Sequence, residues 1–523
     1  MPITPTYPGV YIEEIPSGVR TITGVATSIT AFIGRAWRGP VNDPITINSY
    51  GDYERIFGGL WVESSMSYAV CDFYRNGGSQ AIIVRLDNGA TAATLNLPTG
   101  APIPNDFLLL VAANVGKWGN NLKAIVDYET KDKDEQLPDA SLFNLTIFDA
   151  NGATEKFLNV SINQTNSRYL PKVLEQNSAL VRVAKEQGAW KVPDVRPIII
   201  PVDTPIAATA DSGTHGDSLV LAQFVGVGMR DAKTGLYALE NVDLFNLLCL
   251  PIDFAEENEK ISLVGEAAVY CENDRRAMLL VDPPSAWTNK TTAKNQFLDK
   301  TEYIGTRSKN AALFFPRLRQ PNPLRDNQIE TFAPCGAIAG IFARTDAQRG
   351  VWKAPAGLEA TLNGVPALSV NLTDAENGEL NPLGINCLRS FPGVGRVVWG
   401  SRTLQGADRL ASEWKYIPVR RLTLFLEESL YRGTQWVVFE PNDEPLWSQI
   451  RLNIGAFMNN LFRQGAFQGK SPREAYFVKC DKETTTQNDI DLGIVNIIVG
   501  FAPLKPAEFV IIKFQQIAGN IIT

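Results

Sequence analysis

The sequence predicts a mixed α/β (α+β) protein with several domains. Between residues 240 and 345, strand-like apolar runs alternate with helix-length segments, a pattern typical of a parallel or mixed sheet. Between residues 93 and 205, Pro, Asn and Thr become frequent and short alternating strands appear, which favours a mostly β insertion. At about 150 residues per domain, the 523 residues fit roughly two to four domains.

These changes in composition and residue pattern divide the chain into five parts. The expected division is an N-terminal arm at 1–20, a core formed by 21–92 and 206–390, the insertion at 93–205, a last unit at 391–505 and a C-terminal arm at 506–523.

In the core, apolar runs predict strands, and 3.6-residue periodicity predicts helices between them. The expected core strands are 28–34, 80–86, 247–252, 277–282 and 311–316, and the expected helices are 50–57, 66–76, 261–271, 292–304 and 331–344. Alternating residues predict insertion strands at 122–128, 142–149 and 155–162.

Composition and charge exclude several classes of protein. The net charge of −7 and pI near 5.2 argue against a nucleic-acid binder, which needs a basic face. No apolar stretch approaches the roughly 20 residues that cross a bilayer, and the N-terminus lacks the pattern of a signal peptide. We therefore expect synthesis in a cytoplasm and no membrane insertion. The six cysteines are far apart, which favours buried free thiols.

Recognised catalytic and binding motifs are missing. The single histidine, His215, lies in a polar glycine loop at 211–217, where an exposed side chain is the expectation. The run at 465–471 is one residue short of a phosphate loop, and the run at 391–396 lacks the third glycine of a dinucleotide site. No spacing suits a metal. The sequence thus indicates no catalytic residue, cofactor or metal.

Two pairs of acidic residues leave an enzymatic alternative open. Glu427 and Glu428 are adjacent, and Asp489 is close to Asp491. Such pairs usually belong to solvated faces or helix caps, yet a glycosidase-like pair cannot be recognised from sequence. An α/β enzyme with an unrecognised carboxylate site is therefore the alternative function.

Residues 441–465 predict a capped amphipathic helix. Asn442 or Asp443 can cap it, Pro445 suits its first turn, and Gly465 ends it. One face is apolar, and the polar residues fall largely on the other sides. The helix either covers the sheet of the last unit or also presents its polar side to a partner. The apolar residues are Leu446, Ile450, Ile454, Phe457 and Leu461.

Strand-like segments occur at both ends of the chain. Residues 475–480 and 490–501 can form a hairpin, whereas 509–514 is an isolated apolar strand near the C-terminus. A second isolated strand, at 10–15, lies between Pro8 and Pro16. Unpaired apolar strands invite aggregation in a monomer, so two of them at the termini suggest strand exchange between subunits.

Long strings resemble the contractile tail sheath family, which includes sheaths of phage tails, R-type pyocins and extracellular contractile injection systems. The resemblance follows the chain in order and is weakest over 93–205. It rests on TPTYPGVYIEEIPSG near the N-terminus, FIGRAWRGPVNDP from Phe32, ARTDAQRGVWKAPAG at 343–357, and two long runs that begin at Trp414 and Glu474.

The resemblance implies a structural sheath subunit without enzymatic activity. Such subunits form stacked hexameric rings around an inner tube, exchange terminal strands with neighbours, and contract from a metastable extended state. The implied partners are copies of this chain, the inner tube protein, and baseplate and terminal cap proteins, within a virion tail or a particle released from bacteria. The insertion would face outwards. A tail tube or capsid-like protein is a further alternative, although a tube protein would be much shorter.

The resemblance also implies which residues assemble. The donated strands would contain Val10, Tyr11, Ile12, Ile15, Phe509, Val510, Ile511, Ile512 and Phe514. The receiving hairpin would contain Tyr476, Phe477, Val478, Ile494, Val495, Ile497, Ile498 and Val499. The tube-facing helix would present Arg451, Asn453, Asn459, Asn460 and Arg463.

Overall fold

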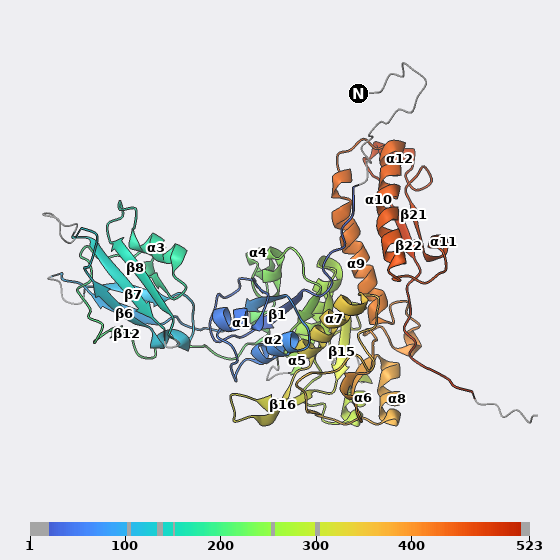
Figure 1. Cartoon of the computed structure of the whole chain (residues 1–523), viewed down its shortest axis with the longest axis horizontal. Helices are drawn as coiled ribbons and strands as arrows, with labels where there is room; N and C mark the ends of the chain where they lie inside the picture. The colour runs from blue at the N-terminus through green and yellow to red at the C-terminus, as the bar shows by residue number, and fades with distance from the viewer. Residues whose placement is uncertain are drawn as a thin grey trace, which may run out of the picture.

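The computed structural model describes residues 20–101, 106–132, 140–149, 152–252, 257–298 and 304–513. The described chain is elongated (Figure 1). A β-rich unit lies at one end and a layered α/β unit in the middle, and two long helices, α9 (Ile417–Gly433) and α10 (Glu444–Arg463), stand beside the middle unit. The expectation of a mixed α/β protein with several units is confirmed.

The middle unit contains an eight-stranded sheet in the order β2-β3-β1-β13-β14-β15-β19-β20. The six inner strands are parallel, and β2 and β20 pair antiparallel at the two edges. The strands are β1 (Thr30–Gly34), β2 (Ile45–Ile47), β3 (Ala81–Arg85), β13 (Leu247–Cys249), β14 (Met278–Val281), β15 (Ala311–Phe315), β19 (Ile385–Phe391) and β20 (Gly395–Val398).

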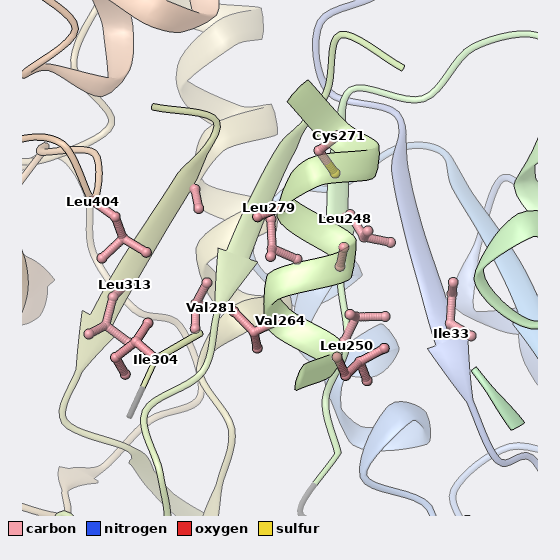
Figure 2. Packing of buried hydrophobic residues seen from close by; sticks show 14 of the residues in the cluster. Ile33, Leu248, Leu250, Val264, Cys271, Leu279, Val281, Ile304, Leu313 and Leu404 are labelled. Carbon is pink, nitrogen blue, oxygen red and sulfur yellow. The ribbon is translucent and has the colours of Figure 1, made fainter. Parts of the chain in front are cut away.

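Helices cover both faces of this sheet, because successive side chains of a buried strand point to opposite faces. Phe32 packs toward α1 (Tyr50–Phe57), α2 (Ser65–Arg75) and α7 (Cys335–Arg349). The other face packs against α5 (Glu257–Val269), α6 (Lys290–Leu298) and α8 (Asp374–Leu380). Figure 2 shows this second face, where Val264 of α5 lies over the strands that carry Leu248 and Leu279.

The β-rich unit has its own hydrophobic cluster. One sheet contains β4 (Thr94–Pro98), β5 (Phe107–Ala112) and β9 (Val181–Val183). The other contains β12 (Ile206–Ala207), β6 (Lys123–Asp127), β7 (Leu142–Phe148) and β8 (Thr154–Ser161). Helix α3 (Leu170–Asn177) and the hairpin β10 (Lys185–Glu186) and β11 (Ala189–Trp190) complete it. The strands expected in the insertion are confirmed, whereas the exact domain boundaries stay a prediction.

One expected helix begins later than predicted. The segment 331–344 was expected to be helical, but Phe332 ends strand β17 (Gln328–Phe332), and α7 starts at Cys335. Pro334 disfavours helical backbone at the residue before it, so the helix can only begin at the proline or beyond. Strand β17 belongs to a small sheet with β16 (Leu318–Asn322) and β18 (Ala367–Leu368), and the short helix α4 (Met229–Ala232) lies elsewhere in the unit.

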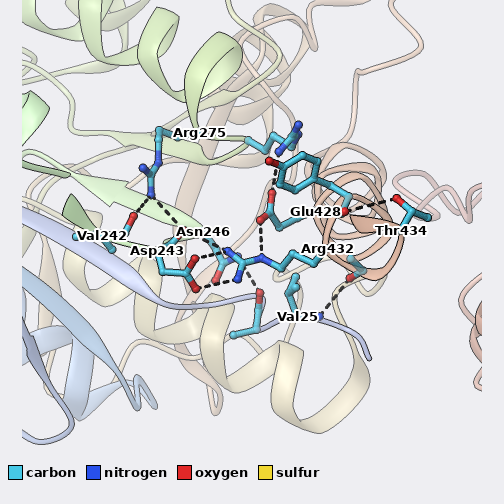
Figure 3. A network of polar contacts seen from close by, with 12 residues as sticks. Val25, Val242, Asp243, Asn246, Arg275, Glu428, Arg432 and Thr434 are labelled. Atoms are coloured by element: carbon cyan, nitrogen blue, oxygen red, sulfur yellow. Dashed lines mark hydrogen bonds and ion pairs between the residues drawn. The ribbon is translucent and has the colours of Figure 1, made fainter. Parts of the chain in front are cut away.

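Ionic contacts attach the long helix α9 to the middle unit. Arg421 binds Asp346 of α7 through two hydrogen bonds of 2.8 and 2.6 Å, and both side chains are buried. Farther along α9, Arg432 binds Asp243 just before β13, and it also binds Glu428 one turn away (Figure 3). Helix α9 is therefore attached to the middle unit by one buried ion pair, Arg421–Asp346, and by the pair of Arg432 with the exposed Asp243.

The six cysteines are free, and all but the half-buried Cys71 are buried, which confirms the prediction of unpaired thiols. Burial raises the pKa of the Cys271 and Cys387 thiols, so both remain protonated and unreactive.

Candidate assembly interface

A two-stranded hairpin lies against α10 in the C-terminal part. Strand β21 (Tyr476–Lys479) pairs antiparallel with β22 (Ile498–Phe501), so that Val478 lies opposite Val499. Tyr476, Val478 and Val499 pack against the cluster around α10. The alternate residues Phe477 and Ile498 are 50% and 48% exposed. One face of the hairpin is thus anchored, and the other face is open.

Helix α10 positions this hairpin as its sequence predicts. The Asp443 side chain accepts a hydrogen bond from the Leu446 N–H and caps the helix, and Pro445 lies in the first turn. The helix ends before Gly465, which has a positive φ of 81°. The predicted apolar face is confirmed, because all its members are buried: Leu446, Ile450, Ile454, Phe457 and Leu461.

The hairpin has two open edges. In the part of the chain that the structure describes, β21 and β22 form a sheet of their own, and no third strand pairs with either. Two-stranded sheets are marginally stable by themselves, and unpaired edges carry free N–H and C=O groups. This hairpin therefore has the geometry to accept further strands.

The C-terminal arm offers apolar residues and lies apart from the hairpin. Phe509, Val510, Ile511 and Ile512 form no strand within the chain, and each is 71–81% exposed. In Figure 1 this segment leads away from the body of the molecule. A run of this kind, exposed in a single subunit, is suited to bury its side chains against another protein.

Some of the predicted exchange residues lie in the hairpin, and others lie outside the residues that the structure describes. Val10, Tyr11, Ile12, Ile15 and Phe514 lie outside the described residues. Within the hairpin lie Tyr476, Phe477, Val478, Ile498 and Val499. The roles of all these residues stay predictions.

The predicted second strand of the hairpin, 490–501, is too long. Residues 487–491 form the short helix α12 (Gln487–Asp491), which Thr486 and Asp489 cap reciprocally. Gly493 then reverses the chain with a φ of 73°. Local capping thus overrides β propensity here. Ile494, Val495 and Ile497 precede β22 and do not belong to the hairpin strands.

The candidate tube-facing residues of α10 fall into two groups. Asn460 and Arg463 are exposed and Asn459 is half-buried, so this end of the helix can reach a partner. Arg451 is engaged within the chain, donating to the Cys480 carbonyl and pairing with Glu444 at 2.6 Å.

Asn453 is misplaced by the sequence prediction. Its side chain is buried, and its Oδ1 accepts the Arg20 N–H at 3.0 Å. Asn453 therefore holds the segment that follows the N-terminal arm and cannot face a partner directly. The apolar face of α10 is wide enough to include this polar residue.

The expectation of an exposed His215 is wrong. Its ring lies between Trp37 and Trp61, with 4.5 Å between ring centroids on either side. Both ring nitrogens are buried without a hydrogen-bond partner in the described part of the chain. Burial, followed by nearby positive charges of which Arg85 is the strongest, lowers the pKa of His215 to about 4. The residue packs between aromatic rings of the core, at the base of the β-rich unit.

The acidic pairs have structural partners. Glu428 binds Arg276 and Arg432, and Asp489 caps α12. Among the described residues, no cluster of His, Cys, Asp and Glu has the arrangement of a metal site. Within the same residues, no helix combines the length and the apolar character needed to span a bilayer.

Two family models match the chain, one over its middle and one over its C-terminal part. The phage tail sheath protein central domain matches residues 226–404, and the phage tail sheath C-terminal domain matches residues 411–517. The second match contains α9, α10 and the hairpin, and the two together cover more than half of the 523 residues. The chain belongs to the contractile tail sheath family.

Known sheath proteins resemble this sheath chain over different spans. The tail sheath protein of Vibrio phage KVP40 is 31% identical over 180 residues, which are 34% of this chain and 26% of that protein. That of Enterobacteria phage T4 is 26% identical over 195 residues, 28% of its length. The chain thus spans about a quarter of these phage relatives.

The resemblance to solved sheath structures extends over nearly the whole chain. The anti-feeding prophage helical sheath in its contracted state is 25% identical, with a TM-score of 0.55, over 98% of this chain and 100% of that one. A contracted sheath complex of the extracellular contractile injection system PVC is 22% identical and shares the fold, with a TM-score of 0.57 over 99% of both chains. The names of these relatives describe tail sheath proteins and contracted sheaths.

Proposed function

We propose that this protein is the sheath subunit of a contractile tail or injection apparatus and that it has no enzymatic role. It polymerises by strand exchange into stacked hexameric rings around an inner tube. The observation that carries the proposal is the combination, in one sheath-family chain, of a hairpin with open edges and a detached apolar arm. Its partners are copies of itself, the tube protein, and baseplate and cap proteins.

In strand exchange, main-chain hydrogen bonds and buried apolar side chains would hold neighbouring subunits together. Each main-chain hydrogen bond to a donated strand contributes about 1 kcal/mol, and each buried Val or Ile side chain contributes about 1.5–3 kcal/mol. Phe509, Val510, Ile511 and Ile512 are the described part of one donor, and β21 with β22 is the acceptor. Because the links are made by terminal arms, subunits can rotate while remaining joined.

Contraction needs no nucleotide in this mechanism. The subunits assemble into an extended lattice of higher free energy and rearrange to a compact lattice of lower free energy when the baseplate releases them. The difference drives the tube through a target envelope. The exposed end of α10, around Asn460 and Arg463, is the proposed contact with the tube before contraction.

The test compares the full chain with a variant that lacks residues 509–523. We expect the full chain to form ordered helical tubes in electron micrographs and the truncated chain to remain in small species with an unchanged melting temperature. Glu413→Gln, a surface substitution, serves as the matched control and should assemble normally. Ordered tubes from the truncated chain would rule out C-terminal strand exchange.

Tube binding has its own test, because assembly and tube contact involve different surfaces. Arg463→Glu should weaken co-sedimentation with the inner tube protein by about tenfold, the equivalent of about 1.4 kcal/mol, without changing the melting temperature. Arg463 is preferred to Arg451 because Arg451 also holds the Cys480 carbonyl and its loss would disturb the hairpin. Unchanged co-sedimentation would remove this end of α10 from the tube interface.

A further inference from the structure

The C-terminal segment is fixed to the body at one side chain and is exposed directly after it. The Glu508 carboxylate accepts hydrogen bonds from Arg402 Nε and Nη2, both at 2.7 Å. Asn381 Nδ2 donates to it at 2.8 Å, and the Tyr416 hydroxyl donates at 3.2 Å. The next residue, Phe509, is already 72% exposed.

Arg402, the main partner of Glu508, is also held by contacts that do not involve Glu508. Arg402 is fully buried, and its Nη1 contacts the Gly406 carbonyl and Asp408. The main-chain N–H of Arg402 donates to Asn386 Oδ1 at 2.6 Å, which connects it to strand β19 of the central sheet. These contacts hold Arg402 in place beside the eight-stranded sheet, and its two parallel hydrogen bonds give the Glu508 carboxylate a defined direction.

The neighbours of Glu508 favour its ionised form. Burial by itself would raise the pKa of Glu508, but hydrogen bonds from Arg402 and Asn381 and the positive charges of Arg402 and Lys415 outweigh it, and the pKa is lowered. The carboxylate therefore stays ionised at neutral pH. An ion pair this enclosed is lost at a high cost when one partner is removed, because Arg402 would remain buried with less compensation.

Among the described residues, Glu508 makes all the polar contacts that hold this part of the chain. Across residues 504–513, as far as the structure describes them, the hydrogen bonds and ion pairs to the rest of the molecule all involve the Glu508 side chain. Residues 504–509 form one wall of a cleft of about 990 Å³, whose other walls include Trp352 and Trp399. Without the ion pair, no polar contact among the described residues would hold the chain from Leu504 onward.

We propose that Glu508 is a positioning residue that fixes the root of the C-terminal arm. This inference rests on the proposed function of the arm in strand exchange. Released at Glu508, residues 509–523 span at most about 50 Å, whereas release at Leu504 would allow about 70 Å. A shorter arm that starts from one fixed point reaches its acceptor at a higher effective concentration and with one register.

A measurement on the single subunit tests the anchor independently of assembly. A spin label at Ala507→Cys, in a chain that also carries Cys71→Ser, should be restricted with Glu508 present and several-fold more mobile with Glu508→Gln. Glu413→Gln is the control, because it makes the same chemical change at an exposed residue close to Arg402 in sequence. It should leave the label restricted. Equal label mobility in the parent chain and in the Glu508→Gln variant would overturn the anchor.

Two insertions of the same composition test the positioning role in assembly and leave Glu508 intact. Gly-Gly between Leu504 and Lys505 lies before the anchor and should assemble like the parent chain. Gly-Gly between Glu508 and Phe509 moves the apolar residues two positions farther from the anchor and out of register with the acceptor, and it should raise the critical concentration for tube formation several-fold. Equal behaviour of the two insertions, while removal of 509–523 still abolishes tubes, would reject the anchor alone. Normal tubes without 509–523 would reject strand exchange itself.

Discussion

The central sheet and the C-terminal hairpin show two ways of treating strand edges in one chain. The eight-stranded sheet has helices on both faces, and its parallel strands end in antiparallel edge strands. The hairpin has one face on α10 and leaves its other face and both edges open within the described residues. The first region completes itself, so its residues determine subunit stability. The second is incomplete in one subunit, so its residues should determine assembly.

The largest expected effect is on the free energy of unfolding. One Phe→Ala substitution in each region tests whether that region determines stability or assembly. Phe314 of β15 is buried and contacts the ring of Phe342, so Phe314→Ala should lower the free energy of unfolding by about 3–5 kcal/mol. Phe477→Ala on the open face should change it by less than about 0.5 kcal/mol and yet impair tube formation. Urea unfolding and electron microscopy measure the two effects. A similar loss of stability from both variants would contradict the distinction.

The next effect concerns the connection between the regions. Asp346→Ala leaves Arg421 buried on α9 without its carboxylate, which should cost about 3 kcal/mol. The matched control is Glu175→Ala, which breaks the half-exposed pair with Lys185 and should cost less than about 0.5 kcal/mol. Thermal unfolding followed by circular dichroism compares them. If the two losses are equal, the buried pair does not fix α9 to the central sheet.

Much of the central region could be predicted because its signals are local. Buried strands such as 311–315 are short continuous apolar runs, and α1 matches its expected range of 50–57. The apolar face of α10 also follows from residue spacing alone. Strong periodicity with clear caps therefore predicts elements reliably, including the helix that supports the hairpin.

The errors occurred where distant residues or short polar motifs decide the structure. His215 looks exposed in its glycine loop, since nothing nearby in sequence indicates that Trp37 and Trp61 enclose it. Residues 490–497 have high β propensity, but the Thr486 and Asp489 caps form the short helix α12 over 487–491, and the strand begins only at Ile498. Glu508 carries no signal at all, because its partner Arg402 is about a hundred positions away. Long-range pairing of this kind requires the fold.

A smaller effect tests whether the support of the hairpin matters to subunit stability. Asp443→Ala removes the side chain that accepts the Leu446 N–H, which should destabilise the chain by about 1 kcal/mol. Asn460→Ala lies on the exposed side of the same helix and should change stability by less than about 0.5 kcal/mol. Urea midpoints measure both. A cost at Asn460 equal to that at Asp443 would show that capping does not set the stability of α10.

The smallest expected effect is a pH dependence at the base of the β-rich unit. His215 has a pKa of about 4 in the folded chain and about 6.5 when unfolded, so the unfolded chain binds more protons between these values. The stabilisation by neutral His215 is complete above pH 6.5 and declines as the pH falls toward 4. Because the ring is only partly buried, screening limits the total loss to less than about 1 kcal/mol.

His215→Gln isolates this contribution, because glutamine does not titrate in that range. The free energy of unfolding of the parent chain should exceed that of the variant most at pH 7, and the difference should shrink by pH 4.5. Chemical denaturation at several pH values gives both curves. Parallel curves would mean that His215 is protonated as easily in the folded chain as in the unfolded one. A shrinking difference would show that the folded chain disfavours the protonated ring, as its enclosure between Trp37 and Trp61 within a single subunit predicts.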